Sequence, residues 1–279
     1  MAYRTILVHC DADRTTQSRV ATAAELAQRF KAHLAGLHVR ARFEAPVFTD
    51  AGAAMDLLYR AYEERSKADE AAATAAFNQG IAHKGVSSEW RTADGAIDQE
   101  LVVQTRYADL VVIGQHDGAA PVTTTPASLP ETVAMATGRP VLVVPHIGVT
   151  KPPGGTVLLC WNASREAARA AADALPFLTA AEKVIVLVID PESSPTGHGP
   201  EPGADVAGWL ARHGVKVTVQ RDSAADSDVG NVILSRAADF GVDLIAMGIY
   251  GHSRLREMVL GGASRTVLAS MTAPVLISH

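Results

Sequence analysis

Glycines near the C-terminal end of the chain are spaced as in a loop that binds phosphate. Gly248, Gly251, Gly261 and Gly262 follow an apolar run of strand type and precede a helical pattern. Glycine permits positive φ, so successive backbone N–H groups can converge on one anion. A helix that begins near Gly262 would add free amides and the positive end of its dipole. The segment therefore predicts a site for a di- or triphosphate.

Basic residues accompany this loop. Arg254, Arg256 and Arg265 lie within twelve positions and would add positive charge for a polyphosphate. The glycine spacing alone fits a plain strand-to-helix turn equally well, because short motifs often occur by chance. We interpret His252, which lies inside the loop, as a solvated residue rather than a ligand.

Other chemistries lack their motifs. The chain has 10 histidines and 2 cysteines, but no HExxH or CxxC spacing that would indicate a zinc site. The GxSxG nucleophile elbow, the Walker lysine loop and GxGxxG are also missing from the sequence. These absences favour anion binding over metal or nucleophilic catalysis.

The strands and helices that would position the loop occur twice. Three pairs of segments match at an offset of 134 residues, and the starts of the two copies match at an offset of 151. The pairs are 109–114 with 243–248, 132–133 with 266–267, 140–142 with 274–276, and 6–11 with 157–162. The first copy must therefore carry about 17 extra residues, which we place in 41–67, in an amphipathic helix that continues to Gln79.

The pattern within each copy predicts an α/β fold. In the second copy, β-branched runs alternate with helical patterns, and the runs are 157–161, 184–189, 215–219, 244–247 and 275–277. Such alternation indicates βαβ units and a parallel sheet, so each copy should be an open doubly wound domain. We expect domains at 1–148 and 156–279 with a linker at 149–155 that is rich in proline and glycine. Ligands of such sheets bind beyond the carboxyl ends of the strands.

Composition excludes several classes. A length of 279 residues suits two domains of about 150 residues each. The 25 basic and 30 acidic residues give a net charge of -5, which argues against a nucleic-acid partner. The longest apolar run, 184–189, falls far short of the roughly 20 residues that span a bilayer, and the first residues show no signal-peptide pattern. We expect a cytoplasmic protein without a membrane partner.

The pattern Gly248-x2-Gly251-x9-Gly261, followed by a small residue, resembles the nucleotide loop of the ATP-binding branch of the universal stress protein family. The resemblance extends to the C-terminal residues 271–279, and it covers nearly the whole chain as two copies. It implies five-stranded parallel sheets of the Rossmann-like, adenine nucleotide alpha hydrolase-like kind, packed as an intramolecular pseudo-dimer. The phosphates of ATP, with Mg²⁺ as the accompanying ion, would contact the loop, and adenosine would contact the ends of the first two strands.

The resemblance assigns each contact to a position of this chain. The expected nucleotide-binding residues are Asn162, Ile189, Asp190, Gly248, Gly251, Arg254, Gly261, Gly262, Ala263 and Ser264. Two of them depart from the family pattern. Asn162 stands where the family usually has aspartate, so a carboxylate acceptor is lost. Gly262 stands where a serine or threonine usually contacts phosphate, and Ser264 is the nearest replacement hydroxyl.

The first copy has lost most of this loop. Gly114, Asp117, Ala127 and Ser128 occupy the places of the four loop glycines. Asp117 would place a carboxylate against phosphate, so we expect no ATP in this copy. Asp11, which aligns with Asn162, keeps an acidic residue at an adenosine-like corner.

Three functions remain open. The leading hypothesis is a nucleotide-dependent stress-response or regulatory factor that binds ATP in its second domain and acts on unidentified protein partners. The second is slow ATP hydrolysis, for which Glu257 is the one acid in the loop. The third is a nucleotide-free interaction module. Beyond the pairing of the two domains, the sequence leaves a homodimer open, and we assign no catalytic or metal-binding residue.

Overall fold

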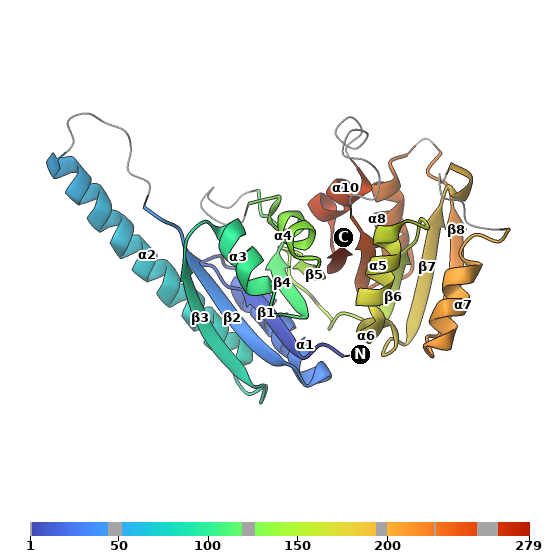
Figure 1. Ribbon diagram of the computed structural model, residues 1–279, viewed down its shortest axis with the longest axis horizontal. Coiled ribbons are helices and arrows are strands. Elements are labelled where there is room, and N and C mark those ends of the chain that lie inside the picture. The colour runs from blue at the N-terminus through green and yellow to red at the C-terminus, as the bar shows by residue number, and fades with distance from the viewer. Residues whose placement is uncertain (1, 44–51, 119–125, 194–199, 226, 250–261) are drawn as a thin grey trace.

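The computed structural model describes residues 2–43, 52–118, 126–193, 200–225, 227–249 and 262–279, with the backbone alone for 52–54 (Figure 1). In domain 1 the elements are β1 Thr5–His9, α1 Thr16–Phe30, β2 His33–Arg40, α2 Gly52–Ile81, β3 Ser88–Asp94, α3 Ile97–Thr105, β4 Leu110–Gly114, α4 Leu129–Thr137 and β5 Val141–Val144. In domain 2 they are β6 Thr156–Cys160, α5 Arg165–Asp173, α6 Leu175–Leu178, β7 Lys183–Ile189, the 3₁₀ turn η1 Pro191–Ser193, α7 Ala204–Arg212, β8 Val217–Asp222, α8 Val229–Asp239, β9 Leu244–Gly248, α10 Ala263–Ser270 and β10 Val275–Ser278.

The ten strands form one sheet in the order β3-β2-β1-β4-β5-β10-β9-β6-β7-β8. Each half is a parallel five-stranded sheet of the doubly wound type, as the sequence predicts. The halves join where β5 and β10 pair antiparallel, with Leu142 opposite Leu276. The two copies are thus packed as a pseudo-dimer within one chain.

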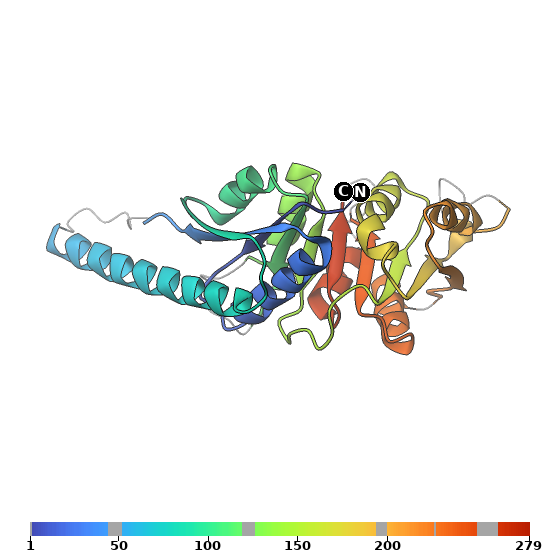
Figure 2. The same cartoon turned by 90° about the horizontal axis from the view of Figure 1, so that it is seen from below.

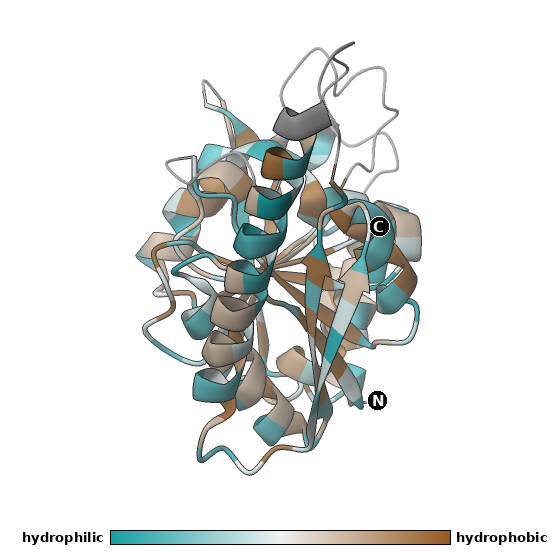
Figure 3. Ribbon diagram, turned by 90° about the vertical axis from the view of Figure 1, so that its left-hand side faces the viewer, coloured by the Kyte–Doolittle hydropathy of each residue, from teal (hydrophilic) through white to brown (hydrophobic). Residues whose placement is uncertain are grey.

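Helices cover both faces of this sheet. Buried side chains of α1, α2, α5, α6 and α7 share one core with the strands, and those of α3, α4, α8 and α10 share the other. Each core runs through both domains. The hydropathy colours show brown strands inside and a mostly teal outer surface on α2 (Figure 3).

The repeated aspartates of the sequence tie strands together at their amino ends. The Asp109 carboxylate accepts hydrogen bonds from the backbone N–H groups of Arg4 (2.8 Å) and Thr5 (3.0 Å). The Asp243 carboxylate likewise accepts from Gly155 (2.9 Å) and Thr156 (3.0 Å). Asp109 and Asp243 are the first residues of the matching segments 109–114 and 243–248. They therefore have the same structural role in the two copies.

An aromatic cluster joins the domains on one side of the sheet. The rings of Tyr3 and Phe30 in domain 1 and of Phe177 in domain 2 have centroids 5.2 to 5.6 Å apart. The Tyr3 hydroxyl also donates to the backbone oxygen of Asp173, at 2.6 Å. Edge-on aromatic packing adds to the free energy of burial, so this cluster stabilises the pairing.

Two residues of opposite charge occupy equivalent positions of the repeat on the opposite face. Glu131 lies on α4 and Arg265 lies on α10, 134 residues apart. Burial raises the pKa of Glu131, and the positive charge of Arg265 partly opposes that rise. The charge of domain 2 therefore acts on an acid of domain 1 at this place in the repeat.

The extra length of the first copy forms a long helix, as expected. α2 has 30 residues, whereas its counterpart α7 has nine. α2 packs on α1, where Gly80 lies so close to Val20 that a Cβ would be 2.5 Å from Val20 Cγ1. Its N-terminal part projects beyond the sheet at the left of Figures 1 and 2. Leu57 on this part is 71% exposed.

Both predicted ends of one strand are wrong. The sequence places it at 215–219, but β8 runs from Val217 to Asp222, and the later start has a clear cause. The reason is the end of α7, where the Val215 N–H donates to the Leu210 oxygen and Gly214 has φ +77°. Val215 therefore closes the helix instead of opening the strand. In the part of the chain that the structure describes, no helix combines the length and apolarity that crossing a membrane requires.

Candidate functional site

The carboxyl ends of β9, β6 and β7 lie side by side, and expected site residues follow each of them. Gly248 ends β9, Asn162 follows β6, and Asp190 follows β7. α10 begins at the same edge, because it crosses back from the end of β9 to the start of β10. Gly251, Arg254 and Gly261 lie outside the described residues.

The amino end of α10 has backbone N–H groups that can bind an anion. Gly262 is the N-cap, and its carbonyl oxygen accepts from the N–H of Arg265 at 2.9 Å. The N–H groups of Ala263 and Ser264 open the helix, where no carbonyl precedes them within the helix. Free amides and the helix dipole together attract negative charge. These residues can hold a phosphate or carboxylate group.

Gly248 is needed for packing at this edge. A Cβ at Gly248 would lie 2.4 Å from the carbonyl carbon of Glu166 and 2.7 Å from the nitrogen of Ala167. The first turn of α5 therefore rests on the end of β9 and can do so because residue 248 has no side chain. This contact brings the start of α5 to the candidate site.

Asn162 shapes the turn that leads into α5. Its side-chain oxygen accepts from the Ser164 N–H at 3.2 Å, and the Ser164 hydroxyl accepts from the Ala167 N–H at 3.1 Å as the N-cap. Asn162 itself is exposed, and Ala163 adopts φ +59°. The amide oxygen of Asn162 therefore takes part in the turn, and the residue is exposed just after the end of β6.

Asp190 closes the next strand end. Its carboxylate accepts from the Ser223 hydroxyl at 2.6 Å and from the Ala224 N–H at 3.2 Å. It therefore ties the end of β7 to the segment after β8. Ile189 packs against the core on the α8 and α10 face. These contacts give Ile189 and Asp190 structural roles at the expected adenosine corner.

The acid nearest to α5's amino end is paired. Burial alone would raise the pKa of Glu166, but hydrogen bonds from its own backbone N–H and from Arg165 hold that pKa below its usual value. The Arg165 Nε to Glu166 Oε1 distance is 3.1 Å. The negative charge at this edge is thus partly compensated.

Domain 1 fills the corresponding corner with a side chain. Arg19 on α1 is 2% exposed, and its guanidinium lies so close to Gly114 that a Cβ there would be 2.1 Å from Arg19 Nη1. Arg19 donates to the His9 carbonyl, to Asp11 and to the Thr16 hydroxyl, each at 2.8 Å. Burial would raise the pKa of Asp11, yet Arg19 holds it far below its usual value.

The structure thus shows a cause of domain 1's altered site that the sequence did not reveal. Asp11, expected at an adenosine-like corner, is in an ion pair with Arg19. Asp117, expected to repel phosphate, lies 3.1 Å from the Arg14 guanidinium. The signal that could have found Arg19 is its alignment at offset 151 with Ala170, a buried alanine of α5.

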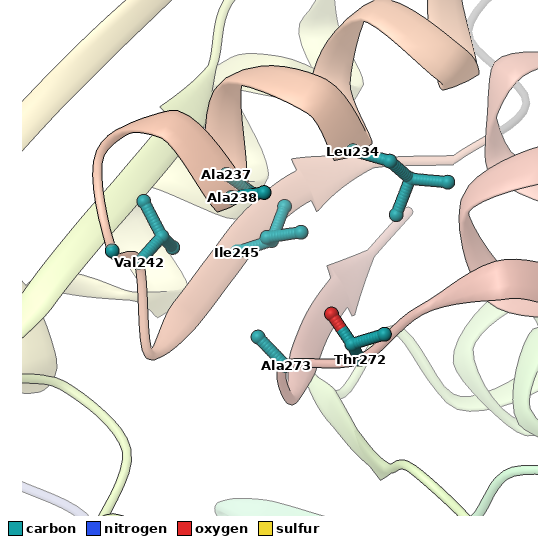
Figure 4. Close-up of a pocket in the computed structure, with 8 residues that line it drawn as sticks. Leu234, Ala237, Ala238, Val242, Ile245, Thr272 and Ala273 are labelled. Atoms are coloured by element: carbon teal, nitrogen blue, oxygen red, sulfur yellow. The ribbon is translucent and has the colours of Figure 1, made fainter.

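Two cavities lie in domain 2. One of about 120 Å³ is at the amino ends of β9 and β10, lined by apolar residues such as Leu234 and Ile245, at the opposite edge from the candidate site (Figure 4). Another of about 400 Å³ lies between α5 and α7 and is lined by Trp161, Trp209 and Asp205. Trp161 directly precedes Asn162, so this cavity adjoins the end of β6. The sequence pattern alone did not indicate this cavity.

Metal and thiol chemistry find little support. Among the described residues, no group of three or more histidine, cysteine, aspartate or glutamate side chains could hold a metal ion. Burial raises the pKa of both Cys10 and Cys160 to about 12, so neither is a thiolate at neutral pH.

Comparison with known proteins places this geometry in context. The model of the universal stress protein family matches residues 2–145 and 155–279. A universal stress protein from Archaeoglobus fulgidus DSM 4304 is similar over 98% of this chain and 95% of its own, with 17% identity and a TM-score of 0.72. A protein of unknown function from Pseudomonas aeruginosa PAO1 is similar over 99% and 92%, with 18% identity and a TM-score of 0.59.

A shorter structure matches half of the chain. A universal stress protein from Archaeoglobus fulgidus in complex with dAMP covers 51% of this chain with 98% of its own, at 17% identity and a TM-score of 0.35. The search of curated proteins found no match.

Proposed function

The chain belongs to the universal stress protein family, and we propose that it binds an adenine nucleotide, ATP in the first instance, in domain 2. The phosphates would lie at the amino end of α10, on the N–H groups of Gly262, Ala263 and Ser264. The loop residues Gly251, Arg254 and Gly261 would complete that site. Adenosine would lie toward Asn162, Ile189 and Asp190.

The observation that carries this proposal is the difference between the two copies. In domain 1, the buried Arg19 side chain occupies the corner over Gly114. At the aligned position of domain 2 stands Ala170, and the backbone of Glu166 and Ala167 takes the space over Gly248, so the described residues place no arginine at that corner. Domain 2 also keeps the glycine N-cap at α10, where α4 of domain 1 begins after Ser128.

The bound state would act as a regulatory signal. The nucleotide site would sit on α5, β9 and α10, and β9 and α5 both contact β10, the strand that pairs with domain 1. We therefore infer that ATP occupancy changes how the chain presents itself to protein partners. Slow ATP hydrolysis is a weaker alternative, because Glu257 is the one acid in the loop sequence and no other candidate for a general base accompanies the glycines.

A nucleotide-free interaction module is the competing function. It is favoured by Asn162, whose amide oxygen already accepts from Ser164 N–H and so serves the turn. Under this alternative the glycines of domain 2 would be turn residues.

The test is direct measurement of binding. The purified chain is denatured, the released small molecules are chromatographed, and the protein is titrated calorimetrically with ATP, ADP and AMP, with and without Mg²⁺. We expect adenine nucleotide in the extract or saturable binding of about one equivalent. Trp161 lies beside Asn162 and offers a fluorescent reporter for the same titration. If extraction and titration both fail to detect nucleotide, the proposal is wrong and the interaction module is favoured.

A further inference from the structure

A side chain of domain 1 holds the helix that opens at the proposed site of domain 2. Gln115, the first residue after β4, is 7% exposed. Its Nε2 donates to the backbone oxygens of Leu268 (2.9 Å) and Ala269 (3.1 Å) in the last turn of α10. Its Oε1 accepts from the His146 N–H at 3.1 Å and lies 2.8 Å from His146 Nδ1. The whole amide of Gln115 is therefore engaged.

These bonds replace the usual end of the helix. α4 ends on Gly138, whose N–H donates to the Ala134 oxygen at 3.1 Å. α10 instead runs into extended backbone at Met271, with φ -63° and ψ 139°, and the described residues provide no backbone N–H that caps its last turn. The last carbonyls of a helix need donors from elsewhere. Gln115 supplies one from the other domain.

The two domains differ at the position of Gln115. At the aligned position of domain 2 stands Ile249, a fully buried apolar residue that cannot donate. Domain 1 therefore holds α10 by hydrogen bonds, whereas domain 2 has a buried aliphatic side chain at the equivalent position. The polar contact is made toward the domain that keeps the glycine N-cap.

We propose that Gln115 is a positioning residue for the nucleotide-binding end of α10, so that domain 1 sets part of the affinity of domain 2. This inference rests on the proposed function. α10 has 8 residues, and a helix of that size is about 12 Å long and moves as a unit. Anchoring its carboxyl end fixes where the amides of Ala263 and Ser264 lie. By linkage, bound nucleotide in turn stabilises the pairing of the domains.

The experiment compares Gln115→Met with a matched control in the full chain. Methionine keeps the length of the side chain but neither donates to Leu268 and Ala269 nor accepts from His146. The control is Arg29→Gln, because Arg29 also reaches across the pair, to the backbone oxygens of Pro153 and Gly154, yet does not touch α10. Amide hydrogen exchange of 265–268, the hydrogen-bonded amides of the first turns of α10, is measured without nucleotide, and ATP affinity is measured by titration.

We expect Gln115→Met to raise the exchange rate at 265–268 and to weaken ATP binding by about fivefold each, the effect of losing a hydrogen bond. Arg29→Gln should leave both quantities unchanged, even if it lowers global stability equally. A milder variant, His146→Ala, loosens Gln115 from the domain 1 side and should act in the same direction. It serves if Gln115→Met does not fold.

The outcomes distinguish the positioning role of Gln115 from the proposed binding of nucleotide by domain 2. Wild-type exchange at 265–268 in Gln115→Met or, failing that, in His146→Ala overturns the positioning role, whatever the affinity. Faster exchange with unchanged ATP affinity also overturns it, since the helix end would then not govern the site. If the wild-type chain binds no nucleotide, the proposed function fails, and the exchange rates alone decide whether domain 1 positions α10.

Discussion

The guanidinium of Arg19 lies directly against Gly114. A Cβ at residue 114 would be 2.1 Å from Arg19 Nη1, so the buried arginine requires glycine at this position. Gly114 matches the repeat glycine Gly248, but its absent side chain makes room for a cation instead of the first turn of a helix. The same small residue therefore serves different neighbours in the two domains.

Removing the cation should destabilise domain 1 strongly. Arg19→Met removes the arginine that pairs with the Asp11 carboxylate, and breaking a buried ion pair costs about 3 to 5 kcal/mol. Urea unfolding followed by circular dichroism measures the loss. Adding Asp11→Asn to Arg19→Met should recover part of it, because the buried negative charge is then gone. No recovery in the double variant would show that packing, not charge, dominates at this corner.

Acid should weaken the fold through His9. Burial lowers the pKa of His9 from 6.5 to about 4. The unfolded chain therefore binds a proton at a higher pH than the folded one, so stability falls as the pH drops from about 6.5 to about 4. The shift corresponds to at most about 3 kcal/mol. Unfolding free energies measured across this window should flatten in His9→Leu.

The matched control for that experiment is a histidine on the surface. His33 lies on β2 with its ring 3.6 Å from Glu89 and partly exposed. Replacing it with glutamine should leave the slope of stability against pH largely as in the wild type. An equally flattened profile in His33→Gln would assign the acid sensitivity to some other group.

A methyl group at Gly248 should disturb both stability and the proposed site. In Gly248→Ala the new Cβ would meet the backbone of Glu166 and Ala167 at 2.4 to 2.7 Å, and backbone cannot rotate aside. We expect a loss of about 1 to 3 kcal/mol from overpacking, and weaker ATP binding. Thermal unfolding and calorimetry measure the two effects.

Gly208→Ala is the control for that substitution. Gly208 lies inside α7, and a Cβ there meets nothing within 4 Å. Alanine is the better helix former, so the control should be neutral or stabilised by up to about 1 kcal/mol. A loss in Gly208→Ala as large as in Gly248→Ala would contradict the packing argument.

The aromatic cluster should hold the two domains in one cooperative unit. Phe177 is fully buried between Tyr3 and Phe30, so Phe177→Ala should cost about 3 to 5 kcal/mol. Tyr3→Phe removes the hydrogen bond to Asp173 alone and should cost about 1 kcal/mol. Calorimetry should show the single transition broadening or splitting in Phe177→Ala but not in Tyr3→Phe. A sharp single transition in both would show that the β5 and β10 pairing suffices.

A carboxylate in the glycine loop should block the nucleotide. Gly251→Asp places an aspartate at the position that Asp117 holds in domain 1. Repulsion between this carboxylate and phosphate is expected to reduce ATP binding below detection by titration, while unfolding stability stays near that of the wild type. Normal ATP affinity in this variant would place the phosphates elsewhere.

The fold could be predicted from sequence because its signals are local and repeated. Apolar strands such as 184–189 that alternate with helical patterns mark βαβ units directly, and the offset of 134 identifies the second copy. The pairing of the two domains within one chain followed from the family resemblance. The fold class is confirmed, whereas the assignment of individual nucleotide contacts stays a prediction.

The missed features depend on contacts between distant residues. Arg19 and Gln115 are polar, and polar residues on a helix or after a strand are normally solvated. Their burial depends on partners far along the chain, Gly114 for Arg19 and the end of α10 for Gln115. A periodic pattern carries no information on such partners.

Glu131 and Arg265 occupy the same place in two copies of one repeat. In a dimer of identical chains, that position would bring like charges together, acid against acid or base against base. Fusion of the copies frees the two sides to differ, so this chain's halves are matched to each other rather than to themselves. If the halves were made as separate polypeptides, mixed pairs should form in preference to either self-pair.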